Sequence, residues 1–229
     1  MDTRPRRNGG RAVRLTRPLP RLFLVTDDQV VGESGFVERA ASAVAAGGPN
    51  CALQLRALRA SGGRLWRLAA ALKPAVEQAG ATLWLNDRID VALAVDAHGV
   101  QLGARSLQVD VGRRLLGDAV WIGASVHSPA AAGESLERGA DVAVLGNVYS
   151  TASHPERAPL GLEPLRQAAA GRPIVAIGGM TPERVTEVVA AGAWGVAVLS
   201  GVWQAEDVAA AVRLYLQALA DVLGSVGTS

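Results

Sequence analysis

Short apolar segments alternate with longer amphipathic segments along almost the whole chain. The short segments are rich in β-branched residues and contain few polar positions, as is typical of strands buried on both faces of a parallel sheet. They span residues 22–26, 52–55, 82–85, 99–102, 121–125, 142–145, 174–177 and 196–199. The pattern therefore predicts eight buried strands.

A helix-like segment follows each predicted strand. These segments span residues 35–46, 63–79, 90–96, 109–116, 129–138, 163–170, 182–191 and 207–223. Eight strand–helix units in about 200 residues are typical of the (β/α)₈ barrel rather than of an open Rossmann sheet. We therefore predict an α/β protein with the architecture of a TIM barrel.

The predicted barrel occupies residues 21–223 as a single domain, with no linker and no second domain. Residues 1–20 contain three prolines and the arginines Arg4, Arg6, Arg7, Arg11, Arg14 and Arg17. We expect this arginine-rich segment to be a disordered tail, and we expect residues 224–229 to fray.

Composition and charge narrow the class of protein. The chain has 229 residues and a formal net charge of +2, which does not indicate a nucleic-acid-binding surface. No apolar run approaches the ~20 residues that a membrane span needs, and no signal peptide is visible, so we expect a cytoplasmic protein without a membrane partner. Cys51 is the only cysteine, which excludes an internal disulfide and favours a buried thiol. A homo-oligomer is compatible with the sequence.

Polar residues gather where the predicted strands end. Functional side chains of (β/α)₈ barrels lie at the carboxyl ends of the strands, so this gathering predicts one site at that face. The residues are Thr26, Asp27, Asp28, Gln54, Arg56, Asn86, Asp87, Gln101, Ser125, His127, Ser128, Asn147, Tyr149, Thr151, Ser153 and His154.

The last two predicted strands end in turns of small residues. In the first turn, Thr181 can cap the following helix and Pro182 suits its first position. Backbone N–H groups that no side chain shields bind phosphate well at the start of a helix. Because the loops after the seventh and eighth strands are the usual phosphate site of this fold, we predict a phosphate site there.

Short motifs occur in a defined order along the chain. They lie at residues 24–27 (Leu-Val-Thr-Asp), 54–56 (Gln-Leu-Arg), 86–90 (Asn-Asp-Arg-Ile-Asp), 99–103 (Gly-Val-Gln-Leu-Gly), 125–128 (Ser-Val-His-Ser), 177–182 (Ile-Gly-Gly-Met-Thr-Pro) and 198–201 (Val-Leu-Ser-Gly). Each is weak alone, but in this order and spacing they resemble the thiamine phosphate synthase and thiazole tautomerase (TenI-like) family of TIM barrels. The resemblance covers roughly residues 21–215.

The resemblance implies an enzyme of thiamine biosynthesis whose small-molecule partner is thiazole phosphate. In one branch, the synthase joins a pyrimidine diphosphate to thiazole phosphate and uses Mg²⁺. In the other, the tautomerase moves a proton on a thiazole phosphate carboxylate without a metal. Both would hold the phosphate with Gly178, Gly179, Leu199, Ser200 and Gly201. The other substrate-binding residues would be Gln54, Arg56, Asn86, Gln101, Ser125, Thr151, Ser153 and His154.

The chain departs from the synthase pattern at three charged positions. Leu58 and His154 stand where the pattern has lysines, and Ser106 stands where it has the aspartate that binds Mg²⁺. In a synthase, Asp87 alone would then be the metal ligand. One carboxylate supplies few ligands for a cation that prefers several oxygen ligands.

Arginines offer a way to keep the synthase chemistry. Arg56, Arg59 and Arg105 could replace part of the missing positive charge, because a guanidinium binds phosphate groups well. A divergent synthase that uses Mg²⁺ is therefore one alternative. A catalytically silent barrel that binds phosphate or has a regulatory role is another.

His127 supplies the chemistry that the tautomerase branch needs. That branch carries the same Ser-Val-His-Ser motif and uses its histidine for proton transfer. A histidine both accepts and donates a proton near neutral pH. We therefore favour a tautomerase-like enzyme with His127 as acid and base and with no cofactor.

Overall fold

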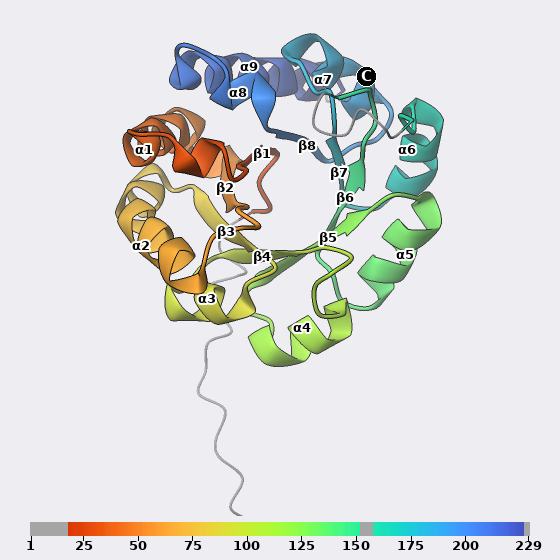
Figure 1. Cartoon of the computed structure of the whole chain (residues 1–229). Helices are drawn as coiled ribbons and strands as arrows, with labels where there is room; N and C mark the ends of the chain where they lie inside the picture. Colours follow the sequence, from red (N-terminus) through yellow and green to blue (C-terminus); the bar gives the residue numbers. More distant parts are fainter. Residues whose placement is uncertain (1–17, 152–157, 227–229) are drawn as a thin grey trace, which may run out of the picture.

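The computed structural model describes residues 18–151 and 158–226. Within them, parallel strands close into a barrel in the order of the sequence, and β8 pairs with β1 (Figure 1). The strands are β1 Leu22–Val25, β2 Cys51–Leu55, β3 Thr82–Asn86, β4 Gly99–Leu102, β5 Trp121–Val126, β6 Val142–Gly146, β7 Ile174–Ile177 and β8 Gly195–Val198. The predicted (β/α)₈ TIM barrel is confirmed, and each predicted strand end lies within one residue of the observed end.

Helices form a ring around the barrel (Figure 1). They are α1 Phe36–Gly47, α2 Gly62–Ala79, α3 Ile89–Ala94, α4 Val109–Leu116, α5 Pro129–Glu137, α6 Leu162–Ala169, α7 Pro182–Ala190, α8 Ser200–Trp203 and α9 Val208–Val226. Two 3₁₀ turns, η2 Val30–Gly32 and η3 Gly48–Asn50, flank α1. No helix in the described part of the chain is long and apolar enough to cross a membrane.

The last helical unit differs from the prediction of one helix over 207–223. The structure has a short α8 directly after β8, and then α9, which runs past the predicted end to Val226. A helix as short as α8 makes about one turn, so its sequence carries no helical period that could reveal it.

Apolar side chains fill the interior of the barrel. Trp84 of β3 is fully buried, and its ring meets the ring of Phe23 edge-on at a centroid distance of 5.1 Å. A Cβ atom at Gly99 would lie 2.3 Å from the Trp84 ring, so the glycine makes room for the indole. The other members of this interior cluster are Val25, Ala52, Val142, Val144, Val175 and Ala197. Because these side chains fill the barrel interior, a ligand must bind nearer the carboxyl ends of the strands.

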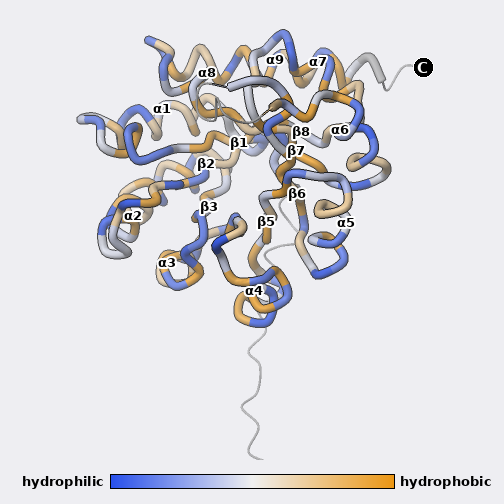
Figure 2. Tube along the Cα trace, turned by 45° about the vertical axis from the view of Figure 1, so that its right-hand side comes forward, coloured by the Kyte–Doolittle hydropathy of each residue, from blue (hydrophilic) through white to orange (hydrophobic). Residues whose placement is uncertain are grey.

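A second apolar layer lies between the strands and the helices. Val44 of α1, Leu72 of α2 and Val188 of α7 are fully buried in it. Figure 2 shows hydrophobic and hydrophilic residues alternating along the helices, as expected when one face of each helix packs on the barrel. Cys51 belongs to this layer, and burial raises the pKa of its thiol to about 12. The expected buried thiol is confirmed.

The ends of the barrel differ from the predicted domain bounds. Leu19 packs against the interior cluster, and Trp194 donates its indole N–H to the Pro20 carbonyl at 3.1 Å. These two residues therefore contact the barrel, although they were assigned to the tail. Residues 224–226, which were expected to fray, continue α9, whereas residues 1–17 and 227–229 of the two expected tails lie outside the described residues.

The strand register brings polar side chains together above the apolar plug. Gln54 lies opposite Trp84, and Gln101 lies opposite both Asn86 and Gly123. Since successive side chains point to opposite faces of a strand, Asn86 faces the barrel interior one layer above Trp84. This polar layer is the floor of the candidate site.

Candidate functional site

A cavity of about 480 Å³ opens at the carboxyl ends of the strands. Its size is suitable for a small-molecule substrate. The predicted site residues that line it are Gln54, Arg56, Asn86, Asp87, Gln101, Ser125, His127, Thr151, Gly178, Gly179, Leu199 and Ser200. Gly201 follows directly in the chain, whereas Ser153 and His154 lie outside the described residues. The structure thus brings nearly all the predicted residues that it describes to one cavity.

Two glycines form the wall at the end of β7. Gly178 and Gly179 have φ angles of +99° and +63°, in the left-handed region that favours glycine. A Cβ atom at Gly178 would lie 2.3 Å from Cβ of Asn147, and one at Gly179 would lie 2.6 Å from the Ser150 carbonyl oxygen. This wall is therefore bare backbone, as a phosphate site requires.

The first residues of α8 extend this wall. Ser200 and Gly201 open the helix, and the first N–H groups of a helix have no partner within it. A Cβ atom at Gly201 would lie 2.1 Å from the Tyr215 hydroxyl oxygen. That hydroxyl donates to the Met180 carbonyl at 2.9 Å, so α9 supports both turns from behind.

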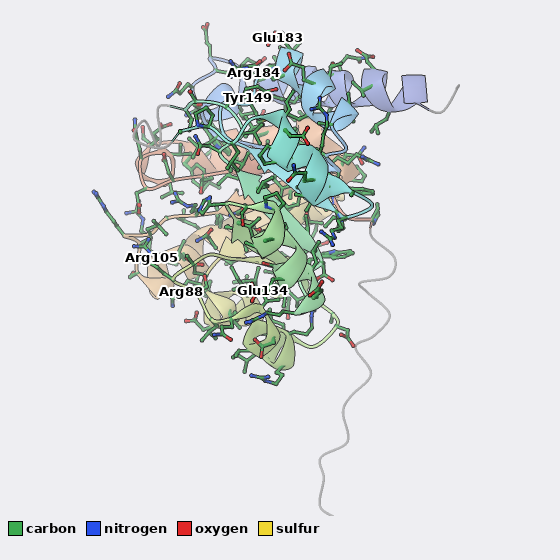
Figure 3. All side chains as sticks on the ribbon, turned by 90° about the vertical axis from the view of Figure 1, so that its right-hand side faces the viewer. Arg88, Arg105, Glu134, Tyr149, Glu183 and Arg184 are labelled. Carbon is green, nitrogen blue, oxygen red and sulfur yellow. The ribbon has the colours of Figure 1, made fainter. Side chains whose placement is uncertain are left out.

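Side chains of α7 hold the glycine turn against the loop after β6. Arg184 donates to the Gly179 carbonyl at 2.5 Å, and its guanidinium lies 4.4 Å from the centre of the Tyr149 ring (Figure 3). Tyr149 in turn donates its hydroxyl to Glu187 at 2.7 Å. Burial, followed by the hydrogen bond to Glu187, raises the pKa of Tyr149 to about 12. Tyr149 therefore keeps its proton at neutral pH.

The cap of α7 differs in one detail from the prediction. Thr181 occupies the N-cap position and Pro182 the first turn, as expected, but the Thr181 side chain makes no capping hydrogen bond. The threonine side chain instead hydrogen-bonds to exposed Glu183, which lowers the pKa of that carboxyl group. Backbone N–H groups at this helix end are thus not occupied by the threonine hydroxyl.

Amide side chains form the floor of the cavity. Gln54 donates to the Asn86 side-chain oxygen at 3.0 Å, and Gln101 donates to the Ser125 hydroxyl at 2.9 Å. The side-chain oxygen of Gln101 is buried and has no hydrogen-bond partner among the described residues. A buried acceptor without a partner is costly, so a hydrogen-bond donor on a bound ligand would stabilise this residue.

Asp87 is committed to hydrogen bonds within the protein. One carboxylate oxygen accepts from the Gly103 N–H at 3.1 Å and from the Ser106 hydroxyl, and the other accepts from Asn86 at 2.8 Å. The backbone of Asp87 is left-handed, with φ of +62°, which is uncommon for a residue other than glycine. This unusual geometry places the carboxylate against the loop after β4.

The donor set does not fit a magnesium ion held by the protein. Asp87 is the only carboxylate among the described residues that line the cavity, and three donors already occupy it. In the described part of the chain, no group of three or more His, Cys, Asp or Glu side chains is placed to hold a metal. Mg²⁺ is usually held by one or two carboxylates together with waters and substrate phosphates. The one carboxylate here already accepts three hydrogen bonds, so it is a weak anchor for the ion.

His127 lies at the rim of the cavity with its ring orientation fixed. Its Nδ1 atom lies 2.5 Å from the Gly146 carbonyl oxygen. A carbonyl oxygen only accepts, so this contact assigns the ring proton to Nδ1. A neutral imidazole in this tautomer accepts a further proton at Nε2.

Two arginines line the cavity, one after β2 and one in the loop after β4. Arg56 is half-buried and Arg105 is exposed, and no carboxylate among the described residues pairs with either guanidinium. Figure 3 places Arg105 well apart from Tyr149 and Arg184. Arg59, the third arginine expected to supply charge, does not line the cavity. Anion-binding groups therefore lie in two parts of the cavity lining: the glycine turns after β7 and β8 form the glycine end, and the arginines after β2 and β4 form the arginine end.

Sequence patterns missed the apolar part of the lining and one glycine below it. The apolar residues include Val25, Val126, Val144, Ile177, Met180, Ala197 and Val198. Each reads as a core residue of a strand or turn, and only the closed barrel shows which ones face the cavity. Gly123 was also missed, although a Cβ atom there would lie 2.0 Å from the Gln101 side-chain oxygen.

Known proteins resemble the chain over most of its length. A family model described as thiamine monophosphate synthase matches residues 22–202. The thiamine-phosphate synthase of Methanoculleus marisnigri is 43% identical over 195 residues, which are 84% of this chain and 92% of that protein. The thiamine-phosphate synthase of Moorella thermoacetica is 39% identical, with the same 84% and 92% covered. Among solved structures, the thiamine phosphate pyrophosphorylase from Pyrococcus furiosus has a TM-score of 0.79 and 34% identity, covering 89% of this chain and 97% of that chain.

Proposed function

Because the chain belongs to the thiamine monophosphate synthase family, an enzyme family of thiamine biosynthesis, we propose that it joins a pyrimidine diphosphate to thiazole phosphate. The two ends of the cavity carry this proposal. Bare glycine turns suit the phosphate of the thiazole, and the two arginines suit a diphosphate. The amide floor between them offers hydrogen bonds to a pyrimidine.

The reaction needs positioning rather than a protein nucleophile. The thiazole nitrogen uses its lone pair to form a bond to the methylene carbon of the pyrimidine. The bond from that carbon to the diphosphate oxygen breaks, and its electron pair leaves with the diphosphate. The enzyme must therefore align two bound molecules and stabilise the negative charge of the departing group. The residues placed to do so are Gly178 and Ser200 at one end and Arg56 and Arg105 at the other.

This proposal replaces the tautomerase that the sequence favoured. The Ser-Val-His-Ser motif and the three lost charges pointed to a tautomerase, yet the relatives that are 43% and 39% identical carry the name thiamine-phosphate synthase. The loss of a few charged positions is therefore weaker support for a tautomerase than similarity along most of the chain is for a synthase.

One observation keeps the tautomerase as a second candidate. His127 has the tautomer and the rim position that proton transfer at a bound thiazole would need. The Asp87 carboxylate, which already accepts three hydrogen bonds within the protein, also agrees with a reaction that requires no metal.

Incubation with defined substrates separates the two candidates. The purified chain is mixed with thiazole phosphate and pyrimidine diphosphate, and separately with the thiazole phosphate carboxylate tautomer alone. For a synthase we expect thiamine phosphate in the first mixture, detected by mass spectrometry. Conversion of the tautomer in the second mixture, abolished in His127→Asn while the ligand still binds, would instead establish the tautomerase. Ligand binding without turnover in either mixture would indicate a silent barrel.

A further inference from the structure

The arginine end of the cavity lacks the metal site that would normally accompany a bound diphosphate. Asp87, the only carboxylate among the described residues that line the cavity, is held by Gly103, Ser106 and Asn86 and has little capacity left for a cation. Ser106 itself contributes a hydroxyl, which is a poor partner for Mg²⁺ compared with a carboxylate. The described residues of the cavity therefore offer little to anchor a cation that would neutralise a diphosphate.

The positive charge at this end comes from the two arginines instead. Arg56 follows β2, and Arg105 lies in the loop after β4, so they approach the cavity from different strands. Neither guanidinium pairs with a carboxylate among the described residues, so none of those carboxylates competes with a ligand for it. A guanidinium offers several N–H donors in a plane and binds phosphate oxygens in a bidentate way.

Hydrogen bonds tie the loop that carries Arg105 to the Asp87 carboxylate. Gly103 donates its N–H to both Asp87 and Ser106, which ties the start of the loop to β3. Arg105 lies two residues further along this loop, and the Asp87 carboxylate to which the loop is tied already accepts three hydrogen bonds. An Asp87 carboxylate with three donors attracts the Arg105 guanidinium less than a carboxylate without partners would, because its charge is already partly neutralised.

We propose that this chain binds diphosphate directly through Arg56 and Arg105, without a divalent cation held by the protein. The proposal rests on the function proposed above, since it names the groups that would receive the departing diphosphate. It concerns the affinity for the diphosphate group, which can be measured without turnover.

Calorimetry with inorganic diphosphate tests this proposal on the full chain. Titrations are run with EDTA and with added Mg²⁺, on the wild type and on Arg56→Gln and Arg105→Gln. Arg67→Gln is the matched control, because Arg67 is an exposed arginine of α2 that does not line the cavity. We expect the wild type and the control to bind diphosphate in EDTA. We expect the affinity of each cavity variant to be at least about tenfold lower.

Two results would overturn the proposal. Binding by the wild type only when Mg²⁺ is present would show that a cation is required. Binding in EDTA that is equal in the wild type and both cavity variants would place the diphosphate elsewhere. Circular dichroism of each variant confirms that a loss of binding is not a loss of fold.

A further variant tests for a gain in the response of diphosphate affinity to Mg²⁺. Ser106→Asp adds a carboxylate beside Asp87 and so creates the paired oxygens that a magnesium ion needs. We expect its affinity for diphosphate to rise severalfold on addition of Mg²⁺, whereas that of the wild type changes little. An equal Mg²⁺ response in the two proteins would count against the proposal.

The outcomes also separate this inference from the proposed function. Formation of thiamine phosphate together with strictly Mg²⁺-dependent diphosphate binding would retain the synthase and reject the arginine site. Arginine-dependent binding in EDTA without thiamine phosphate formation would retain the site and reject the synthase.

Discussion

The glycine turn after β7 shows how a single residue can determine a binding wall. Gly178→Ala adds a methyl group that would meet Asn147, and it also forces alanine into a left-handed conformation. We expect a loss of about 2–4 kcal/mol in the free energy of unfolding and a large loss of thiazole phosphate affinity. Thermal unfolding and calorimetry with thiazole phosphate measure the two effects.

Gly171→Ala is the matched control for this prediction. Gly171 also has a positive φ, of +69°, but nothing lies within 4 Å of a Cβ atom there. We expect it to lose about 1 kcal/mol from the left-handed conformation alone and to keep its ligand affinity. Equal losses in the two variants would show that the packing around Gly178 is unimportant.

Arg184 acts on the phosphate end through the carbonyl of Gly179 and the ring of Tyr149. Arg184→Met removes the hydrogen bond and the cation–π contact but keeps much of the side-chain length. We expect the KM for thiazole phosphate to rise about tenfold while kcat changes by less than about twofold, because a positioning group affects binding of the ground state and the transition state alike.

Arg213→Met on α9 is a control with the same chemical change at an exposed arginine, whose nearest carboxylate, that of Asp207, lies 3.9 Å away. A fall in kcat at unchanged KM in Arg184→Met would contradict the positioning role. That result would place Arg184 in the chemical step.

At the scale of elements, β4 has a glycine where the barrel interior receives Trp84. Gly99→Ala would force the indole to move, since the new Cβ atom would lie 2.3 Å from the ring. We expect a loss of about 1–3 kcal/mol in the free energy of unfolding and a lower Tm by several degrees. Gly32→Ala in the 3₁₀ turn after β1, where nothing lies within 4 Å, should leave the Tm nearly unchanged.

Most elements of this barrel were predictable from periodicity, and the exceptions have physical causes. Buried parallel strands read as continuous apolar runs, which is why each strand was found. Helix α8 was missed because one turn has no detectable period. The interior roles of Gly99 and Gly123 depend on which residues of neighbouring strands lie opposite each other, and no local pattern contains that information.

The position of many candidate site residues was likewise predictable from the sequence. The position of polar residues at strand ends located Gln54, Asn86 and Gln101 correctly, because the barrel fold gathers these ends at one face. The hydrogen bonds that commit Asp87 were not predictable, since they join loops after different strands. The roles of these residues in catalysis remain predictions.

At the scale of the whole molecule, the buried thiol of Cys51 reports on unfolding. Burial raises the pKa of this thiol to about 12, so the folded state holds the proton more tightly than the unfolded state does. Its contribution to stability is therefore complete below about pH 9 and is lost as the pH rises toward 12. At pH 8 we expect a thiol reagent to react slowly with the native chain and rapidly after unfolding in urea, with one thiol per chain.

Reaction of this thiol at the same rate in the native and unfolded chains would show that the layer between α1, α9 and the barrel is open. Cys51→Ser provides the baseline for the reagent. A thiol that is protected in the native chain would confirm that this layer is closed in the folded barrel.

The whole cavity, with a glycine end and an arginine end, is the basis of the synthase proposal. The most direct test measures thiamine phosphate and free diphosphate together after thiazole phosphate and pyrimidine diphosphate are mixed with the chain. We predict that both products appear in a one-to-one ratio, and that Arg105→Gln slows both equally. Diphosphate release without thiamine phosphate, or neither product under conditions where a known synthase forms both, would contradict the proposal.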